Sequence, residues 1–362
     1  METDNSGSFF NYLPEGCRLC YKGAKMVLFV TGVCGKNCFY CPVSYERKEK
    51  DVVFANERPV EKDEDVIEEA LSMDALGTGI TGGEPLLRLE RVNHYIKLLK
   101  NRFGKSHHIH LYTALAPDKE MLGSLRKAGL DEIRFHPPQD MLANIGSTHY
   151  RESIIAAREL GLCAGIEIPS IPNDFRGILL LLEEVEGFLN LNELEFSETN
   201  ATELRKRGFA PLNDISSAAS GSRKAAESVQ GSKVHFCSSS FKDAVQLRER
   251  LKRTARMTAR DFDEITEDGT LVYGIIAGNC LDILRDAGVT DDMYILSNES
   301  VGSVGSVGSV GSVGSVGPVG SVETAWWIAE DLAQELKEAG CSVSVIERYP
   351  VKNGMIVEKT PF

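Results

Sequence analysis

Three cysteines near the start of the chain have the residue type and spacing of metal ligands. Cys34, Cys38 and Cys41 share one short segment, which follows an apolar run at 26–30 that is typical of a buried strand. Three thiolates on one loop can converge on a polynuclear iron–sulfur centre and leave one iron open, whereas tetrahedral zinc takes four ligands, usually as two pairs. The spacing therefore favours a 4Fe–4S cluster with an open position. A structural zinc loop and three unconnected thiols are the alternatives.

A second motif, Thr81-Gly-Gly-Glu-Pro85, follows the next predicted strand at 77–80. The paired glycines Gly82 and Gly83 let the backbone approach a ligand closely, and the Glu84 carboxylate can accept a hydrogen bond from an ammonium group. Taken alone, Glu84 is better explained as a surface carboxylate. Because both motifs follow strands of one predicted sheet, we expect them to meet at the same rim.

Four further residues offer a second set of ligands. Cys17 and Cys20 have a spacing found in zinc and cluster sites, and His235 and Cys237 lie far downstream. Three cysteines and one histidine would complete a tetrahedral zinc site or hold an auxiliary iron–sulfur cluster. The alternative is that the cysteines are free thiols and His235 is a core residue beside a helix start.

The elements that must position these residues alternate between short apolar runs and helical patterns. The pitch is about 30 residues, which is the length of one strand–helix unit. Six such units fit either a barrel or an open doubly wound sheet, and both place function beyond the carboxyl ends of the strands. The predicted strands are at 26–30, 77–80, 109–113, 132–135, 164–168 and 193–196.

The organisation of the whole chain follows from where this alternation stops. An extension at 1–24 carries Cys17 and Cys20, and the strand–helix region runs over 25–200. The segment 201–264 is predicted to be helical and partly basic, and 265–362 to be a small α/β domain. A Val-Gly-Ser repeat at 301–322 interrupts that domain, and its small side chains predict a flexible linker or surface loop.

Composition narrows the classes of function. A hydrophobic content of 42% and a charged content of 26% are ordinary globular values, and the net charge of -13 argues against a globally basic nucleic-acid binder. No apolar run approaches the ~20 residues that span a bilayer, and the amino terminus is unlike a signal peptide. We therefore expect a cytoplasmic protein without membrane contact, in which clustered cysteines bind metal more often than they form disulfides.

Taken together, the two motifs resemble those of the radical S-adenosylmethionine (SAM) superfamily. Its signature is C-x3-C-x2-C with an aromatic residue before the last cysteine, here Tyr40, followed by a Gly-Gly-Glu segment after the second strand. The resemblance implies a partial (β/α)6 barrel over about 25–200. Within the superfamily, the phrases Leu28-Phe-Val-Thr-Gly32 and His108-Ile-His-Leu-Tyr-Thr113 resemble an archaeal group related to the pyruvate formate-lyase activating enzyme.

The resemblance also implies a chemistry. A reduced 4Fe–4S cluster cleaves S-adenosylmethionine, and the resulting 5′-deoxyadenosyl radical takes a hydrogen atom from a substrate. Carried over by position, the three cysteines of the first motif ligate the cluster, Gly82, Gly83 and Glu84 contact the methionine end, and Tyr40 lies against the adenine.

Five further residues at the predicted carboxyl ends of strands face the same mouth and are candidates to contact ribose, the SAM carboxylate or substrate. Ser197 and Glu198 are the candidates for cofactor binding. The full set is Arg134, His136, Glu167, Ser197 and Glu198.

The substrate and partners stay open at this point. The resemblance implies a low-potential electron donor of the ferredoxin or flavodoxin type, and a protein substrate if the chain acts as an activase. The alternative is RNA or a small metabolite, with the basic segment at 241–260 binding phosphates. A hypothesis of another class is a non-catalytic iron–sulfur or zinc scaffold or redox sensor, which would not cleave SAM.

Overall fold

A computed structural model describes residues 2–297, 320–351 and 354–362. The chain divides into two compact units, Met1–Arg250 and Leu251–Phe362, called here the first and the second unit. Most of the predicted Val-Gly-Ser linker lies outside the described residues. Its last two residues, Ser321 and Val322, belong to strand β15 (Ser321–Thr324). In the described ranges, no helix combines the length and apolarity needed to cross a bilayer.

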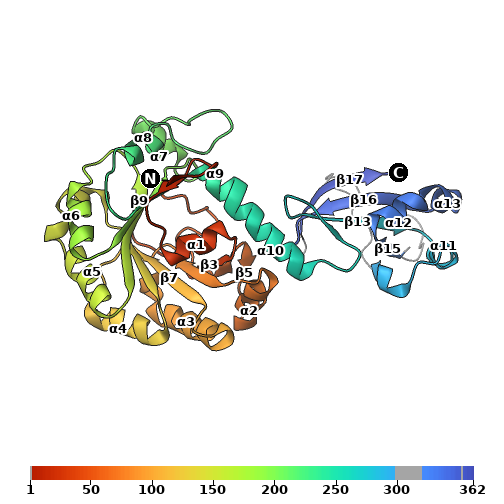
Figure 1. Cartoon of the computed structure of the whole chain (residues 1–362), viewed down its shortest axis with the longest axis horizontal. Helices are drawn as coiled ribbons and strands as arrows, with labels where there is room; N and C mark the ends of the chain where they lie inside the picture. The colour runs from red at the N-terminus through yellow and green to blue at the C-terminus, as the bar shows by residue number, and fades with distance from the viewer. Residues whose placement is uncertain (1, 298–319, 352–353) are drawn as a thin grey trace. The chain divides into compact units, whose positions relative to one another are not determined.

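One sheet of eleven strands forms the first unit within the described residues, and seven of its strands run parallel (Figure 1). Their spatial order follows their order in the chain, so that each strand and its helix add to the same edge. The parallel strands are β3 (Lys25–Phe29), β6 (Gly77–Thr81), β7 (His108–Thr113), β8 (Glu132–Phe135), β9 (Cys163–Ser170), β10 (Phe188–Glu193) and β11 (Val234–Cys237).

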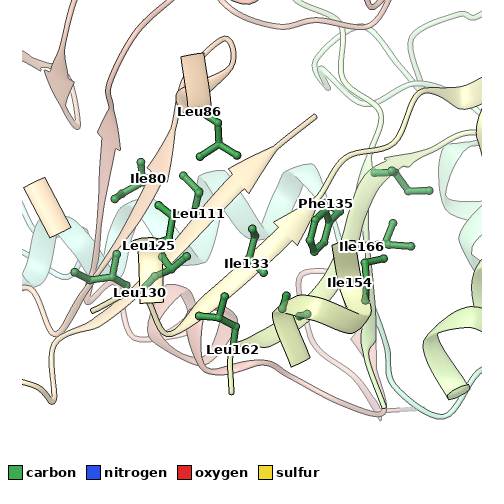
Figure 2. Packing of buried hydrophobic residues seen from close by; sticks show 14 of the residues in the cluster. Ile80, Leu86, Leu111, Leu125, Leu130, Ile133, Phe135, Ile154, Leu162 and Ile166 are labelled. Carbon is green, nitrogen blue, oxygen red and sulfur yellow. The ribbon is translucent and has the colours of Figure 1, made fainter. Parts of the chain in front are cut away.

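Helices cover the outer face of this sheet, whereas the short helix α1 (Glu15–Tyr21) lies on its inner face (Figure 1). Apolar residues from alternate strand positions and from the helices form one core between the layers, as Figure 2 shows for Ile80, Leu111, Ile133 and Ile154. The outer helices are α2 (Asp63–Ser72), α3 (Leu89–Phe103), α4 (Lys119–Ala128), α5 (His149–Glu159) and α6 (Arg176–Glu184).

Short antiparallel strands occupy both edges of the parallel sheet. At one edge, β2 (Phe9–Phe10) pairs with β11 and with β1 (Glu2–Thr3). At the other edge, β4 (Phe54–Ala55) pairs with β3 and with β5 (Arg58–Pro59). The sheet therefore curves as an open, partial barrel, which agrees with the fold class predicted from the sequence.

Two strand predictions are wrong. The sixth strand is β10, at Phe188–Glu193 rather than 193–196, because apolar and polar residues alternate through the whole segment 188–196 and no breaker marks where pairing stops. A seventh parallel strand, β11, lies inside the segment 201–264 that was predicted to be helical. Its four residues are flanked by serine and glycine, and so short a run gives little periodicity.

The rest of the segment 201–264 is helical in short pieces. Ser238 caps the first turn after β11, since its Oγ accepts a hydrogen bond from the Phe241 amide at 3.1 Å. The predicted basic helix continues through three consecutive parts, a turn of α-helix, a π-helical stretch and a longer α-helix, because the residues at both joins keep helical φ and ψ. These pieces and the preceding ones are α7 (Ala201–Lys206), α8 (Ser222–Glu227), α9 (Ser239–Phe241), η3 (Lys242–Leu247) and α10 (Arg248–Thr258).

The second unit is an antiparallel sheet with helices packed against it. Ile276, Leu284, Leu336 and Val343 lie in its apolar core. The helical segment after β15 is two helices separated at Leu332, whose φ and ψ of −95° and 2° leave the helical region. The main elements are β13 (Leu271–Ala277), α11 (Leu281–Asp286), β14 (Tyr294–Ser297), α12 (Trp326–Asp331), α13 (Ala333–Glu338), β16 (Ser342–Arg348) and β17 (Ile356–Pro361).

Candidate active site

One cavity of about 490 Å³ brings the two sequence motifs of the first unit together. Cys34, Cys38 and Cys41 line it from the loop after β3, and Gly82 and Gly83 line it from the loop after β6. β3 and β6 are hydrogen-bonded neighbours, so the loops at their carboxyl ends necessarily lie side by side. The predicted meeting of the two motifs at one rim is what the structure shows.

The cysteine loop is fastened at its base. The Thr31 hydroxyl donates to Asp51 Oδ1 at 2.8 Å, and Arg91 Nη1 donates both to Asp51 at 2.6 Å and to the Val30 carbonyl at 2.8 Å. The Arg91 guanidinium holds the pKa of Asp51 well below its usual range. Because both ends of the loop are tied to one carboxylate, the three thiols are presented from a fixed base.

The glycines of both loops are required by packing between the loops. A Cβ on Gly83 would lie 2.5 Å from the Gly32 carbonyl oxygen, and a Cβ on Gly82 would lie 2.5 Å from the Thr31 carbonyl oxygen. The Gly83 amide donates to the Thr31 carbonyl at 2.7 Å, which holds the loops together. Only glycine permits this approach without displacing the cysteine loop.

Glu84 organises the rim from behind. Its fully buried carboxylate accepts from the Thr113 hydroxyl at 2.8 Å, the Ala114 amide at 2.7 Å and the Leu86 amide at 3.0 Å. Burial raises its pKa, against these hydrogen bonds. Glu84 itself is not one of the described residues that line the cavity. Its contact with a methionine ammonium group stays a prediction, and its observed contacts join the loops after β6 and β7.

Tyr40 is buried in the cavity wall. Its hydroxyl lies 2.9 Å from His136 Nε2, and His136 Nδ1 lies 2.9 Å from the Glu167 carbonyl. Burial raises the pKa of Tyr40 and lowers that of His136. Asn200 Nδ2 donates to the Tyr40 carbonyl at 3.1 Å, so the tyrosine is held at both its ring and its backbone.

An ion-pair network forms the part of the wall contributed by β8 and β9. The Arg134 guanidinium is 2% exposed and contacts Glu132 at 2.5 Å and Glu167 at 2.6 Å. Asn190 and Asn192 on β10 donate to Glu167 at 2.9 and 2.8 Å. Burial alone would raise the pKa of Glu167, but Arg134 and the two amides lower it to about 2. The wall therefore presents fixed charges to the cavity.

The candidate second set of ligands lies in the same cavity. Cys17, Cys20, His235 and Cys237 all line it. Burial raises the pKa of Cys17 to about 12 and also raises the pKa of Cys237. Across the ranges that the structure describes, no three or more His, Cys, Asp or Glu side chains are arranged to hold a metal ion. For either cysteine group to bind metal, its side chains would have to turn toward one another.

The remaining predicted site residues are placed as follows. Arg134, His136 and Glu167 line the cavity, whereas Ser197 and Glu198 are not among its described lining residues. The Ser197 amide donates to Asn200 Oδ1 at 2.8 Å, and Glu198 is exposed. Binding of cofactor by these two residues stays a prediction.

Sequence reasoning missed the neighbours that hold the cysteine loop from the other side. Thr199 Oγ1 donates to the Cys41 carbonyl at 3.1 Å, and Asn200 is buried beside Tyr40. It also missed Asn190 and Asn192, because polar residues inside a strand carry no ligand spacing of their own. The Thr-Asn pair before α7 is the one local signal, since such residues are favoured at helix starts.

Comparison with known proteins agrees with this geometry. Residues 28–161 match the model of the radical SAM superfamily. Residues 318–362 match a domain of unknown function, DUF8061. Among solved structures, methylornithine synthase (PylB) is similar with a TM-score of 0.38 and 14% identity, over 53% of this chain and 58% of that chain.

A protein of Methanocaldococcus jannaschii is 38% identical over 373 residues, which cover 97% of this chain and 93% of the relative. That protein carries the provisional name glycyl-radical enzyme activating enzyme. Membership of this family implies a 4Fe–4S cluster and S-adenosylmethionine, together with a reductant and a substrate. The thiol triad on one tethered loop, beside a glycine backbone at the next strand, fits that requirement. The chain therefore belongs to the radical SAM superfamily and is a radical SAM enzyme related to the activating enzymes.

Proposed function

We propose that this radical SAM enzyme acts on a protein partner, as an activating enzyme that abstracts a hydrogen atom from a glycine residue. The relative of Methanocaldococcus jannaschii supports this substrate class, because its similarity extends over nearly the whole of both chains. The observation that carries the chemistry is the shared cavity of the cysteine triad and the Gly82–Gly83 backbone.

Each part of the cavity rim has its own role. Cys34, Cys38 and Cys41 hold the cluster, and the backbone of Gly82 and Gly83 receives the methionine end of S-adenosylmethionine. When bound, the cluster supplies one electron to S-adenosylmethionine, whose cleavage gives methionine and a 5′-deoxyadenosyl radical. Glu84 acts as a positioning residue, since its hydrogen bonds join the loop that carries the glycines to the loop after β7.

The wall opposite the glycines orients the other ligand groups. Tyr40 presents a flat ring beside the last cysteine, held by His136 and Asn200. Arg134 lies between two carboxylates, Glu132 at 2.5 Å and Glu167 at 2.6 Å, so this wall offers ribose or substrate polar contacts of both signs of charge. Burial of this wall keeps bulk water away from a reactive radical.

An RNA substrate has less support. Three cations of the basic segment are already paired within the protein: Lys242 with Glu195, Arg250 with Glu57 and Arg260 with Asp263. We also propose that the protein works in the cytoplasm, where the reducing environment keeps its free cysteines as thiols. Its electron donor is of the ferredoxin or flavodoxin type.

Cleavage of S-adenosylmethionine tests the chemistry. The anaerobic protein, reconstituted with iron and sulfide and reduced with dithionite, should form 5′-deoxyadenosine, and Cys38→Ala should form none. Cys163→Ala is the matched control, because Cys163 lies on β9 outside the cavity lining of the described residues and should leave the product unchanged. Equal product from Cys38→Ala and the wild type would contradict the assignment.

Isotope transfer tests the substrate class. Protein is extracted from cells grown on glycine deuterated at the α-carbon, dialysed, treated with RNase and offered to the enzyme as substrate. We expect deuterium to be transferred into 5′-deoxyadenosine, which mass spectrometry detects. Label that appears only when the dialysate is added back would identify a small metabolite, and label that an untreated extract gives but RNase alone removes would identify RNA.

A further inference from the structure

The inner wall of the cavity carries a second group of soft ligands that radical SAM chemistry leaves unassigned. Cys17 and Cys20 are three residues apart on α1 and therefore share one side of that helix. His235 and Cys237 are two residues apart on β11 and therefore share one face of that strand. All four side chains line the same cavity.

Pairing within the sheet brings the two segments together. The β10–β11 register aligns Asn190 with His235 and Asn192 with Cys237. Asn190 Nδ2 donates to Cys17 Sγ at 3.3 Å, which places the α1 thiol beside the strand pair that carries the histidine. Cys237 lies within electrostatic range of both Cys17 and Cys20. Segments more than two hundred positions apart in the chain thus contribute to one small region.

His235 is an imidazole without a partner at this wall. It is 2% exposed, and within the described residues neither of its ring nitrogens has a hydrogen-bond partner. Its neighbours Phe10 and Tyr21 present rings to it, with centroids 6.1 and 6.4 Å away. Leaving a buried polar group without a partner is unfavourable, so a ligand that binds a ring nitrogen would remove that penalty.

The sequence around Cys17 is suited to this placement. A Cβ on Gly16 would lie 2.6 Å from Arg134 Nη2 and from His110 Nδ1, so a larger residue here would displace one of these buried side chains or move α1. Arg134 and Lys25 act electrostatically on Cys17, and Lys242 acts on Cys237. These cations offset the negative charge that several thiolates bring to a metal centre.

We propose that Cys17, Cys20, Cys237 and His235 form a second metal centre, separate from the Cys34–Cys38–Cys41 cluster. Its ligand set suits a thiophilic transition metal, as zinc or as the iron of an iron–sulfur cluster. On binding, each thiol that becomes a ligand releases one proton to solvent, and His235 binds through a ring-nitrogen lone pair. Binding of zinc requires no electron transfer, and the side chains turn toward one another from their orientations in the structure.

Metal binding to the full chain with Cys34, Cys38 and Cys41 changed to Ala tests the proposal without radical chemistry. This variant, purified anaerobically and exposed to zinc alone, should retain about one zinc per chain, as a Cys3His site does. Cobalt in place of zinc should give thiolate-to-metal absorption. In a parallel arm, iron and sulfide should be retained instead if the centre is a cluster, so metal and labile-sulfide analysis distinguishes the two.

Further substitutions in the triple variant assign the ligands. Adding Cys237→Ser or Cys17→Ser should abolish metal retention, and His235→Ala should weaken cobalt binding by at least ~10-fold and change the absorption spectrum. Adding Cys163→Ser should change neither. Retention that survives both Cys17→Ser and Cys237→Ser would overturn the proposal.

A second route does not depend on the folding of the triple variant. In the otherwise intact chain, Cys17→Ser with Cys20→Ser should lower the metal content relative to the wild type while the signature cluster remains. Unchanged metal content in a folded protein would overturn the second centre. Failure of the whole radical SAM assignment would appear separately, as absent SAM cleavage by the wild type.

Discussion

The two units of the chain differ in where they bury charge and reactive groups. The first unit contains all seven histidines and seven of the nine cysteines, whereas both tryptophans lie in the second unit. The first unit surrounds a cavity whose wall buries an arginine between two glutamates. The second unit has a core of aliphatic side chains with two buried cysteines, Cys280 and Cys341, under an antiparallel sheet. The chemistry of this protein therefore belongs to the first unit.

The same difference supplies a way to follow each unit by itself. Trp326 and Trp327 are the chain's tryptophans, and both are in α12. Tryptophan fluorescence consequently reports unfolding of the second unit, while far-UV circular dichroism reports both. For a protein of two units, separate transitions are expected rather than one.

Removing the buried cation should have the largest effect. Arg134→Met leaves Glu132 and Glu167 without their counter-charge, and breaking such a buried network costs about 3–5 kcal/mol. The first unit should unfold at a lower urea concentration, as circular dichroism measures it, while the urea midpoint of the fluorescence transition should not change. Arg176→Met, at a side chain that is 86% exposed, is the matched control and should change neither. A parallel shift of both signals would show that the units unfold as one.

The converse change lies in the second unit. Leu336 is fully buried in α13, so Leu336→Ala should destabilise this unit by about 3 kcal/mol. Here the fluorescence transition should shift and the first-unit transition should not. Leu296→Ala, at a side chain that is 64% exposed, should leave both transitions unchanged.

A lower pH should destabilise the first unit and not the second, with a smaller effect than these substitutions. Burial lowers the pKa of His107 from 6.5 to about 4, so below pH 6.5 the unfolded chain binds a proton that the folded chain does not. Stability from this group is thus present above pH 6.5 and lost as the pH falls, by about 1 kcal/mol between pH 7 and 5.5. His108 and His110 shift in the same direction. Urea titrations should show the first unit weakening, with a constant fluorescence midpoint.

The sequence predicted the rim of the site better than its wall. Cys34, Cys38 and Cys41 are contiguous in one loop, and the glycine motif follows an adjacent strand, so spacing and strand order were sufficient. Glu84 shows the limit of that reasoning, since residue type suggested a ligand contact and the structure gives it three partners within the protein. The direction of a side chain depends on packing that a motif does not encode.

The wall was less predictable because polar residues inside a barrel weaken the pattern of a strand. Asn190 and Asn192 on β10 donate hydrogen bonds to Glu167 on β9, and asparagine is depleted in strands. β11 was missed for a related reason, since four residues give no measurable period. The convergence of α1 and β11 depends on chain topology, which no local window contains.

The pairing of β2 with β11 has a consequence for biosynthesis. Phe9 aligns with Phe236, and their rings stack with centroids 4.9 Å apart. β2 leaves the ribosome long before β11, so it must wait until nearly the entire first unit has been translated before it can pair with that strand. Contacts of such long sequence separation slow folding, so nascent β2 stays without this partner strand, within reach of chaperones, during that interval.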